Sequence, residues 1–289
     1  MKQQANNFQA VTPEVLAWIA AETALGRSPD AIFTALQEAG WQPAAARQAM
    51  QLAAQEACAL AQPQPSAVPA TAAVPCVAAA GPGDTLDAGD KWVTVLQRRQ
   101  DPELLVFGHL LSVAECEGLV EAARPRLSRS LTVDLKTGGE ELNADRTSQG
   151  MFFTRSENAL VQRVEARIAR LLNWPAQNSE GLQVLRYARG AEYKPHYDYF
   201  DPAEPGTPAI LQRGGQRVAT LIMYLHEPAE GGATVFPDIG LRVPPQRGSA
   251  VFFSYARAHP SSRTLHGGEP VHAGEKWIAT QWLRERKFS

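Results

Sequence analysis

The sequence predicts a mainly β fold with flanking helices, of the jelly-roll or barrel type, behind a small N-terminal bundle of three helices. From residue 182 onward, short segments rich in β-branched and aromatic residues are separated by glycine-containing breaks such as Gly231-Gly232. Two helical stretches precede these segments. Helices followed by many short strands are typical of a sheet that closes on itself and is backed by helices.

Residues 10–60 are expected to form the small three-helix module. Each of its segments begins with a polar residue followed by proline, a pattern that suits a cap and the first helical position, at Thr12-Pro13, Ser28-Pro29 and Gln42-Pro43. Gly26 and Gly40 then follow the first two segments as C-terminal stops. This pattern of helix start and stop residues is similar to that of ubiquitin-associated-type modules that bind a protein partner. A capping or oligomerisation bundle has the same pattern, so both roles stay open.

Residues 61–90 are expected to be a linker between two domains. Alanine, proline, glycine and valine dominate this stretch, and such a composition buries too little surface to offset the entropy of ordering. The second domain is then expected over 91–289. It begins with two strands, at "KWVTVLQ" and "PELLVFGHL", and continues with a helix capped by Ser112.

The overall charge argues against two classes of partner. The net charge is −2 and the pI is about 6.3, so no basic surface for nucleic acid or anionic membrane is indicated. No apolar run approaches the ~20 residues of a membrane helix, and the first residues do not read as a signal peptide. The three cysteines, Cys58, Cys76 and Cys116, form no CxxC pair. We therefore expect a cytoplasmic protein that binds neither nucleic acid nor membrane.

The stretch "EYKPHYDYF", residues 192–200, places His196 and Asp198 two positions apart. In a strand, both side chains would point to the same face. His266, at an expected strand end just before Gly267-Gly268, is a candidate for a third ligand. Two histidines and one carboxylate on one side of a metal are the ligand set of non-haem Fe(II) oxygenases. An isolated HxD pair is common, so this prediction needs independent support.

The segment "EKWIATQWL", residues 275–283, supplies that support. It reads as a strand buried on both faces, yet it carries Lys276. A buried ammonium group needs an anionic partner. A ligand carboxylate would serve, and so would Glu269 or Glu275. A lysine that reaches solvent from a strand end is the remaining alternative.

Five sequence blocks occur in order along the C-terminal region, namely "RTSQG" (146–150), "YARGAEYKPHYDYF", "RVATLIMYLHEPAEGGATVFP", "RGSAVFF" and "RTLHGGEPVHAGEKWIATQWLRE". Through these blocks, residues 95–286 resemble the prolyl 4-hydroxylase branch of the Fe(II)/2-oxoglutarate dioxygenases. The resemblance implies a double-stranded β-helix, also called a jelly-roll or cupin-like fold, for the catalytic domain.

The resemblance also implies the roles of individual residues. His196, Asp198 and His266 would bind Fe(II), and Lys276 would pair with the distal carboxylate of 2-oxoglutarate. Further contacts to this co-substrate would come from Tyr187, Tyr224 and Thr280. Arg146 and Trp282 would line the substrate groove.

The implied reaction is hydroxylation of a prolyl residue at C4 in a protein or peptide. It consumes O2 and 2-oxoglutarate and releases succinate and CO2, and ascorbate is the expected reductant for oxidised iron. Two alternatives stay open. One is the same chemistry on a free amino acid or another small molecule. The other is a binding module that senses oxygen or 2-oxoglutarate while the N-terminal bundle holds a protein partner.

Overall fold

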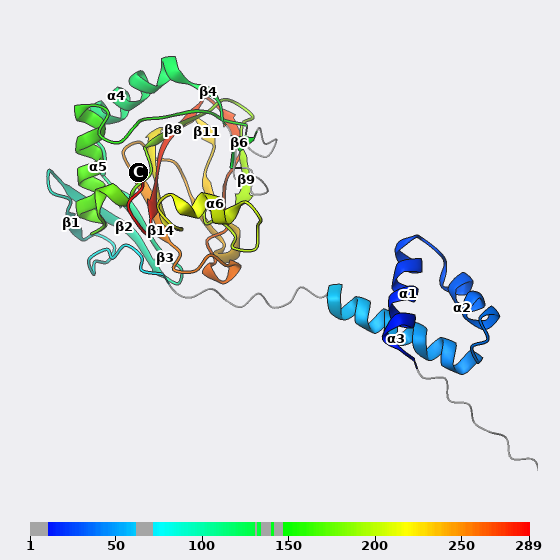
Figure 1. Cartoon of the computed structure of the whole chain (residues 1–289). Coiled ribbons are helices and arrows are strands. Elements are labelled where there is room, and N and C mark those ends of the chain that lie inside the picture. The colour runs from blue at the N-terminus through cyan, green and yellow to red at the C-terminus, as the bar shows by residue number, and fades with distance from the viewer. Residues whose placement is uncertain (1–10, 62–71, 131, 134–139, 142–146) are drawn as a thin grey trace, which may run out of the picture. The chain divides into compact units, whose positions relative to one another are not determined.

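The computed structural model describes residues 11–61, 72–130, 132–133, 140–141 and 147–289 (Figure 1). The chain divides into two compact units, Met1–Val68 and Pro69–Ser289. Among the described residues, no helix is both long and apolar enough to cross a membrane.

The small unit consists of helices α1 (Pro13–Ala24), α2 (Pro29–Glu38) and α3 (Pro43–Ala61). The Ser28 hydroxyl accepts a hydrogen bond from the Ala31 amide at 3.3 Å, so it caps α2 as its position before proline predicts. Gly26 and Gly40 adopt φ values of +81° and +87° after the first two helices, where glycine is the least strained residue. One apolar cluster fills the unit and comprises Ile19, Ile32, Leu36, Ala46, Ala49 and Ala53.

The large unit is built on a nine-stranded sheet. Its strand order is β1-β2-β3-β14-β10-β17-β8-β7-β4. The strands are β1 (Thr85–Asp87), β2 (Trp92–Gln100), β3 (Glu103–Gly108), β4 (Ser128–Arg129), β7 (Gln149–Phe152), β8 (Gln183–Tyr187), β10 (Arg217–His226), β14 (Ala250–Ser254) and β17 (Lys276–Arg284).

A four-stranded sheet of order β13-β12-β15-β9 lies against this large sheet. Its strands are β9 (Tyr193–His196), β12 (Thr234–Phe236), β13 (Leu241–Val243) and β15 (His266–Gly268). Two short pairs complete the strands, namely β11 (Glu230–Gly231) with β16 (Val271–Ala273) and β5 (Thr132–Val133) with β6 (Glu140–Glu141).

The large sheet is buried on both faces. One face packs against helices α4 (Val113–Ala123) and α5 (Ala159–Leu171) through a cluster that includes Leu119, Val164 and Ala279. The other face packs against the four-stranded sheet through a cluster that includes Ile278 and Phe236. A third helix, α6 (Thr207–Gln212), lies between β9 and β10 in the chain. The predicted fold class, mainly β with flanking helices and an N-terminal helical unit, is confirmed.

The expected linker, residues 61–90, differs from the structure over its second half. Residues 62–71 lie outside the described residues, but 72–90 pack onto the large unit. Val77 is only 5% exposed within the main core, and β1 pairs with β2 at the edge of the large sheet. The Ala72 amide donates a hydrogen bond to the Ala256 carbonyl at 2.7 Å. The composition of residues 72–90 wrongly indicated a linker. Small residues lose little side-chain entropy when they become ordered, so a few buried contacts suffice to hold them in place.

Candidate active site

Two histidines meet across neighbouring strands of the smaller sheet. Strands β15 and β9 pair antiparallel with His266 opposite His196, and the two ring centroids lie 4.5 Å apart. Gly267 follows, and a Cβ there would stand 2.9 Å from the Tyr193 carbonyl oxygen, which is too close for a side chain. The glycine after His266 therefore allows the two strands to approach and brings the imidazoles together.

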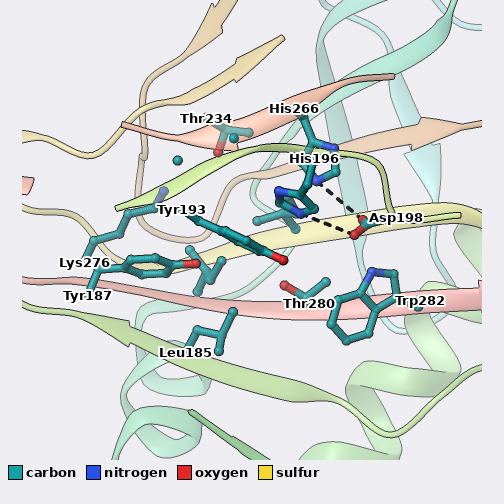
Figure 2. Close-up of a pocket in the computed structure, with 14 residues that line it drawn as sticks. Leu185, Tyr187, Tyr193, His196, Asp198, Thr234, His266, Lys276, Thr280 and Trp282 are labelled. Atoms are coloured by element: carbon teal, nitrogen blue, oxygen red, sulfur yellow. Dashed lines mark ion pairs between the residues drawn. The ribbon is translucent and has the colours of Figure 1, made fainter. Parts of the chain in front are cut away.

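Asp198 reaches the same point by a different route from the predicted one. Strand β9 ends at His196, so Asp198 lies in the bend that follows and not on a continuing strand. One carboxylate oxygen still lies 3.5 Å from Nε2 of His196, and the other lies 3.5 Å from Nε2 of His266. The candidate ligand atoms of the three residues all lie within 4.8 Å of one another. Figure 2 shows the three side chains pointing toward one another.

Backbone carbonyls fix the orientation of both imidazole rings. Nδ1 of His196 lies 2.9 Å from the Lys194 carbonyl oxygen, and Nδ1 of His266 lies 3.0 Å from that of Thr264. A carbonyl only accepts hydrogen bonds, so Nδ1 carries the proton in each ring. Nε2 then keeps its lone pair and faces the cluster, which is the arrangement of metal-binding histidines.

A buried hydroxyl orients the carboxylate. Thr220 donates from Oγ1 to Oδ2 of Asp198 at 2.7 Å. Because that proton is used, the Tyr255 hydroxyl, 2.9 Å away, donates to Thr220 Oγ1 in turn. Both Thr220 and Tyr255 are buried. Neither residue was predicted from the sequence.

The electrostatic environment favours the protonation states that a metal requires. Burial acts to raise the pKa of Asp198, but the neighbouring His266, His196 and Arg217 hold that pKa below its ordinary value. Burial lowers the pKa of His266 to about 4, although the charge of Asp198 opposes the shift. An ionised Asp198 beside a neutral His266 can bind a metal ion without first losing protons.

Lys276 lies in the same cavity and is 3% exposed. Burial lowers the pKa of Lys276 to about 7, opposed by the charge of Glu269. No carboxylate among the described residues forms an ion pair with this ammonium group, because Glu269 is paired with Arg242 at 2.7 Å and Glu275 with Arg186 at 2.6 Å. Strand β17 is buried along its whole length, so the alternative of a lysine reaching solvent is wrong.

The cavity is built from one face of the large sheet. Alternate residues of β17, namely Lys276, Ile278, Thr280 and Trp282, all line it, as the period of two predicts for one strand face. Pairing of β17 with β8 sets Lys276 opposite Tyr187, and pairing with β10 sets Trp282 opposite Thr220. In Figure 2, Lys276 and Tyr187 lie at one end of the cavity and Asp198 and Trp282 at the other.

Tyr224, a predicted site residue, does not line the cavity. Tyr224 is fully buried, and its hydroxyl donates to Thr234 Oγ1 at 2.8 Å, so Thr234 lines the cavity in its place. The ring centroid of Tyr224 lies 5.7 Å from the Lys276 ammonium nitrogen. Arg146 lies outside the described residues.

Tyr193 is a cavity residue that the sequence analysis missed. Its ring stacks on His196 with a centroid separation of 3.7 Å. The aromatic-rich run around the HxD pair was the available signal. The apolar lining was not predicted either and consists of Leu185 and Ile222, with Ile278 from the buried strand.

The residues present fit Fe(II) and a small dicarboxylate. Two imidazoles and a carboxylate converge on one point, and at the far end of the same cavity stands a buried cation that has no carboxylate partner among the described residues. A five-carbon diacid would connect these two ends and neutralise the ammonium group.

Comparisons with known proteins agree with this site. The sequence matches the 2OG-Fe(II) oxygenase superfamily over residues 182–284. Prolyl 4-hydroxylase 1 of Arabidopsis thaliana is 43% identical over 205 residues, which cover 65% of this chain and 71% of the relative. Prolyl 4-hydroxylase 5 of the same plant is 38% identical over 227 residues, with coverages of 71% and 76%.

Among solved structures, the chain is similar to the viral collagen prolyl hydroxylase of Paramecium Bursaria Chlorella virus-1, crystallised with 2OG. The identity is 32%, the TM-score is 0.49, and the match covers 63% of this chain and 95% of the viral one. The fold, the site and the sequence matches together define a 2-oxoglutarate-dependent Fe(II) dioxygenase. Within that class, the identity and coverage of the plant relatives show that the chain belongs to the prolyl 4-hydroxylase family.

Proposed function

We propose that this protein hydroxylates prolyl residues at C4 in a protein or peptide, consuming O2 and 2-oxoglutarate and releasing succinate and CO2. The observation that carries the proposal is the shared cavity, in which the His196–Asp198–His266 cluster faces a buried Lys276. The choice of substrate is supported by its relatives, which are named prolyl 4-hydroxylases.

His196, Asp198 and His266 are the proposed iron ligands. Bound Fe(II) would supply the oxygen chemistry, which no amino acid side chain provides. The protein holds both Nε2 atoms and the carboxylate on one side of the metal position, and this leaves the other side free for substrates. The hydrogen bonds to Lys194, Thr264 and Thr220 keep these ligands in place before the metal arrives.

Lys276 is the proposed anchor for the distal carboxylate of 2-oxoglutarate. Tyr187 lies beside it across the strand pair, and Thr280 faces the cavity further along β17. Apolar walls from Leu185 and Ile222 exclude water, so the charge pair is stronger than it would be in solvent. We assign Tyr224 a supporting role, since its ring packs near the ammonium group and its hydroxyl holds Thr234.

The substrate groove is proposed to run past Trp282 and to include Arg146. Trp282 closes the metal end of the cavity, and the exposed Phe152 lies beside it with a ring-centroid separation of 6.4 Å. Flat aromatic surface at the mouth of such a cavity suits a prolyl ring. We further interpret the two facing sheets as the double-stranded β-helix that the family resemblance implies.

Three further assignments belong to the proposal. Ascorbate would restore iron oxidised in turnovers without substrate. The three-helix unit would bind a protein partner, supported by side chains of Trp18 and Leu25 that are 37% and 77% exposed. A cytoplasmic location is supported by the unpaired thiols of Cys76 and Cys116.

The test combines two measurements on the iron-loaded protein. Incubation with a library of proline-containing peptides should release succinate and add one oxygen atom to proline, located by mass spectrometry. The His266→Ala variant should do neither, because it lacks one ligand. Succinate release with oxygen added only to free amino acids or other small molecules would favour the small-molecule alternative. A protein that binds 2-oxoglutarate but releases no succinate would favour the sensing module.

A further inference from the structure

A second cavity lies on the other side of Trp282 from the metal cavity. It has a volume of about 750 Å³ and is lined by residues that include Phe152, Arg155, Glu180, Arg213, Arg217 and Arg284. Two of its lining residues pack directly on Trp282. The Arg217 guanidinium carbon lies 4.0 Å from the indole ring centroid, and Phe152 makes the ring contact already described. The two cavities are therefore neighbours along one surface of the large sheet.

Strand β17 contributes one residue to each cavity from the same face, namely Trp282 to the metal cavity and Arg284 to the second cavity. Trp282 and Arg284 are two positions apart, so their side chains point to the same side and lie roughly 7 Å apart along the strand. Trp282 stands opposite Thr220, which holds Asp198, and so marks the level of the metal ligands. The second cavity lies two residues further along β17, at Arg284.

Positive charge dominates the wall of this second cavity. Four arginines line it, together with a single carboxylate from Glu180. Both oxygens of Glu180 are used by Arg217, which donates from Nε at 2.7 Å and from Nη2 at 2.9 Å. Arg155 donates to the Gln177 carbonyl and Arg213 to the Ser289 main-chain oxygen. Within the described part of the cavity wall, guanidinium groups thus outnumber carboxylates.

Among the residues that the structure describes, two donor atoms of Arg284 have no acceptor. The side chain is 2% exposed, and its Nε and Nη1 have no hydrogen-bond partner in the part of the chain that is described. Its Nη1 comes no closer than 3.5 Å to Glu180, which is already occupied by Arg217. Burial lowers the pKa of Arg284 to about 10. Buried donors without acceptors are rare in proteins, so this guanidinium group keeps an uncompensated positive charge behind the cavity wall.

Aromatic rings hold the guanidinium groups in fixed planes. The Arg284 guanidinium carbon lies 5.1 Å from the ring centroids of both Phe200 and Phe288, and that of Arg213 lies 3.9 Å from Phe288. Stacked guanidinium groups lose little freedom on binding and match the two oxygens of a carboxylate. The exposed Phe152 adds apolar surface at the entrance. This combination suits a peptide that carries an acidic side chain.

We propose that this second cavity is a subsite for an acidic side chain of the peptide substrate, located two or three residues from the target proline. This inference rests on the proposed function. The spacing follows from the ~7 Å along β17, since an extended peptide advances about 3.3 Å per residue. The carboxylate would accept hydrogen bonds from the accessible Arg213 and Arg155 and would neutralise part of the excess positive charge, including that of the buried Arg284.

The experiment uses the full-length protein and pairs of proline peptides that differ only by Glu or Gln at each position from one to four residues on either side of the proline. Binding of fluorescently labelled peptide is measured with Mn(II) and 2-oxoglutarate present, so it requires no turnover. Hydroxylation of the same peptides is measured separately with Fe(II). Arg213→Gln and Arg155→Gln are the main variants because neither side chain is fully buried, and Arg284→Met is the third. Arg170→Gln, an exposed arginine outside the cavity, is the matched control.

We expect the glutamate peptide to bind about fivefold more tightly than its glutamine partner at two or three residues from the proline. Arg213→Gln or Arg155→Gln should reduce this preference, and Arg170→Gln should keep it. Equal affinity for both peptides at every position would overturn the subsite, as would an unchanged preference in all three cavity variants. Competition by free glutamate at the same concentration would also overturn it, in favour of a small-molecule site. A glutamate preference in binding without any hydroxylation would support the subsite and count against prolyl hydroxylation, so the two failures are distinguishable.

Discussion

At the scale of single residues, the Thr220 hydroxyl determines how Asp198 presents its carboxylate to the metal position. It occupies Oδ2 with a hydrogen bond of 2.7 Å and is itself held by Tyr255. Removing such a partner of a metal ligand usually weakens metal affinity by about 10- to 100-fold. We expect Thr220→Val to show a loss in this range.

The measurement for Thr220 is an anaerobic titration with Fe(II) or Co(II), which reports metal affinity without turnover. Thr220→Ser is the control, because it keeps the hydroxyl and should bind metal within about threefold of the parent protein. If Thr220→Val bound metal as tightly as the parent, the hydrogen bond to Asp198 would have no orienting role.

The second prediction at this scale concerns the charge of Lys276. Its pKa is lowered to about 7 by burial, so in the free protein the ammonium form is present below pH 7 and is lost above it. The dissociation constant of 2-oxoglutarate should therefore be flat below pH 7 and rise by about tenfold per pH unit above it. Calorimetric titration with Mn(II) bound, between pH 6 and 9, tests this.

A matched variant isolates the lysine in that titration. Lys276→Arg keeps its charge throughout the range, so its affinity, even if weaker overall, should not depend on pH in the same way. A pH-independent dissociation constant in the parent protein would show that Lys276 stays charged and that its cavity is more polar than its burial indicates.

Site residues that have a local sequence signal could be predicted, whereas residues whose role depends on contacts between distant strands could not. His196, Asp198 and Lys276 stand out because two metal-type ligands lie two positions apart and because a cation interrupts a buried strand. Thr220 and Tyr193 carry no such local signal. Their importance comes from contacts with Asp198 and His196 that exist only after distant strands pair.

At the scale of elements, capping patterns in the sequence predicted where helices begin. Composition did not predict which irregular segments pack against the core. Ser112 and Glu115 form both hydrogen bonds of a capping box at the start of α4, as their spacing indicates. The segment 72–90 has no comparable signal, and its order comes from long-range contacts. Asp90 shows this, since it pairs with the buried Arg167, 77 positions away in the chain, at 2.6 Å.

Two truncations test the structural role of that segment. Deletion of residues 1–71 should leave the large unit as stable as in the full chain. Deletion of 1–90 removes Val77, β1 and the Asp90 partner of Arg167, so we expect a loss of about 3 kcal/mol or more in the free energy of unfolding. Urea denaturation followed by tryptophan fluorescence compares the two. Equal stability of both truncations would mean that 72–90 contributes nothing, as the linker expectation requires.

At the scale of the whole molecule, the chain consists of two units with separate cores. The small one is filled by the cluster around Ile32 and Ala46, and the large one contains the metal-ligand cluster and Lys276. Each unit thus has what a domain needs to fold by itself. All residues that line the metal cavity belong to the large unit, so the binding energy of active-site ligands should stabilise that unit and not the other.

This division predicts two thermal transitions in scanning calorimetry of the full-length protein. Mn(II) with 2-oxoglutarate, at 100 times their dissociation constants, should stabilise the large unit by about 2.7 kcal/mol for each ligand, because only its folded form binds them. The corresponding midpoint should rise by several degrees, while the smaller transition should stay where it is. The His266→Ala variant should lose most of the shift. A single transition that moved as a whole on ligand addition would show that the two units unfold together, and the helical unit would then be a structural part of the enzyme.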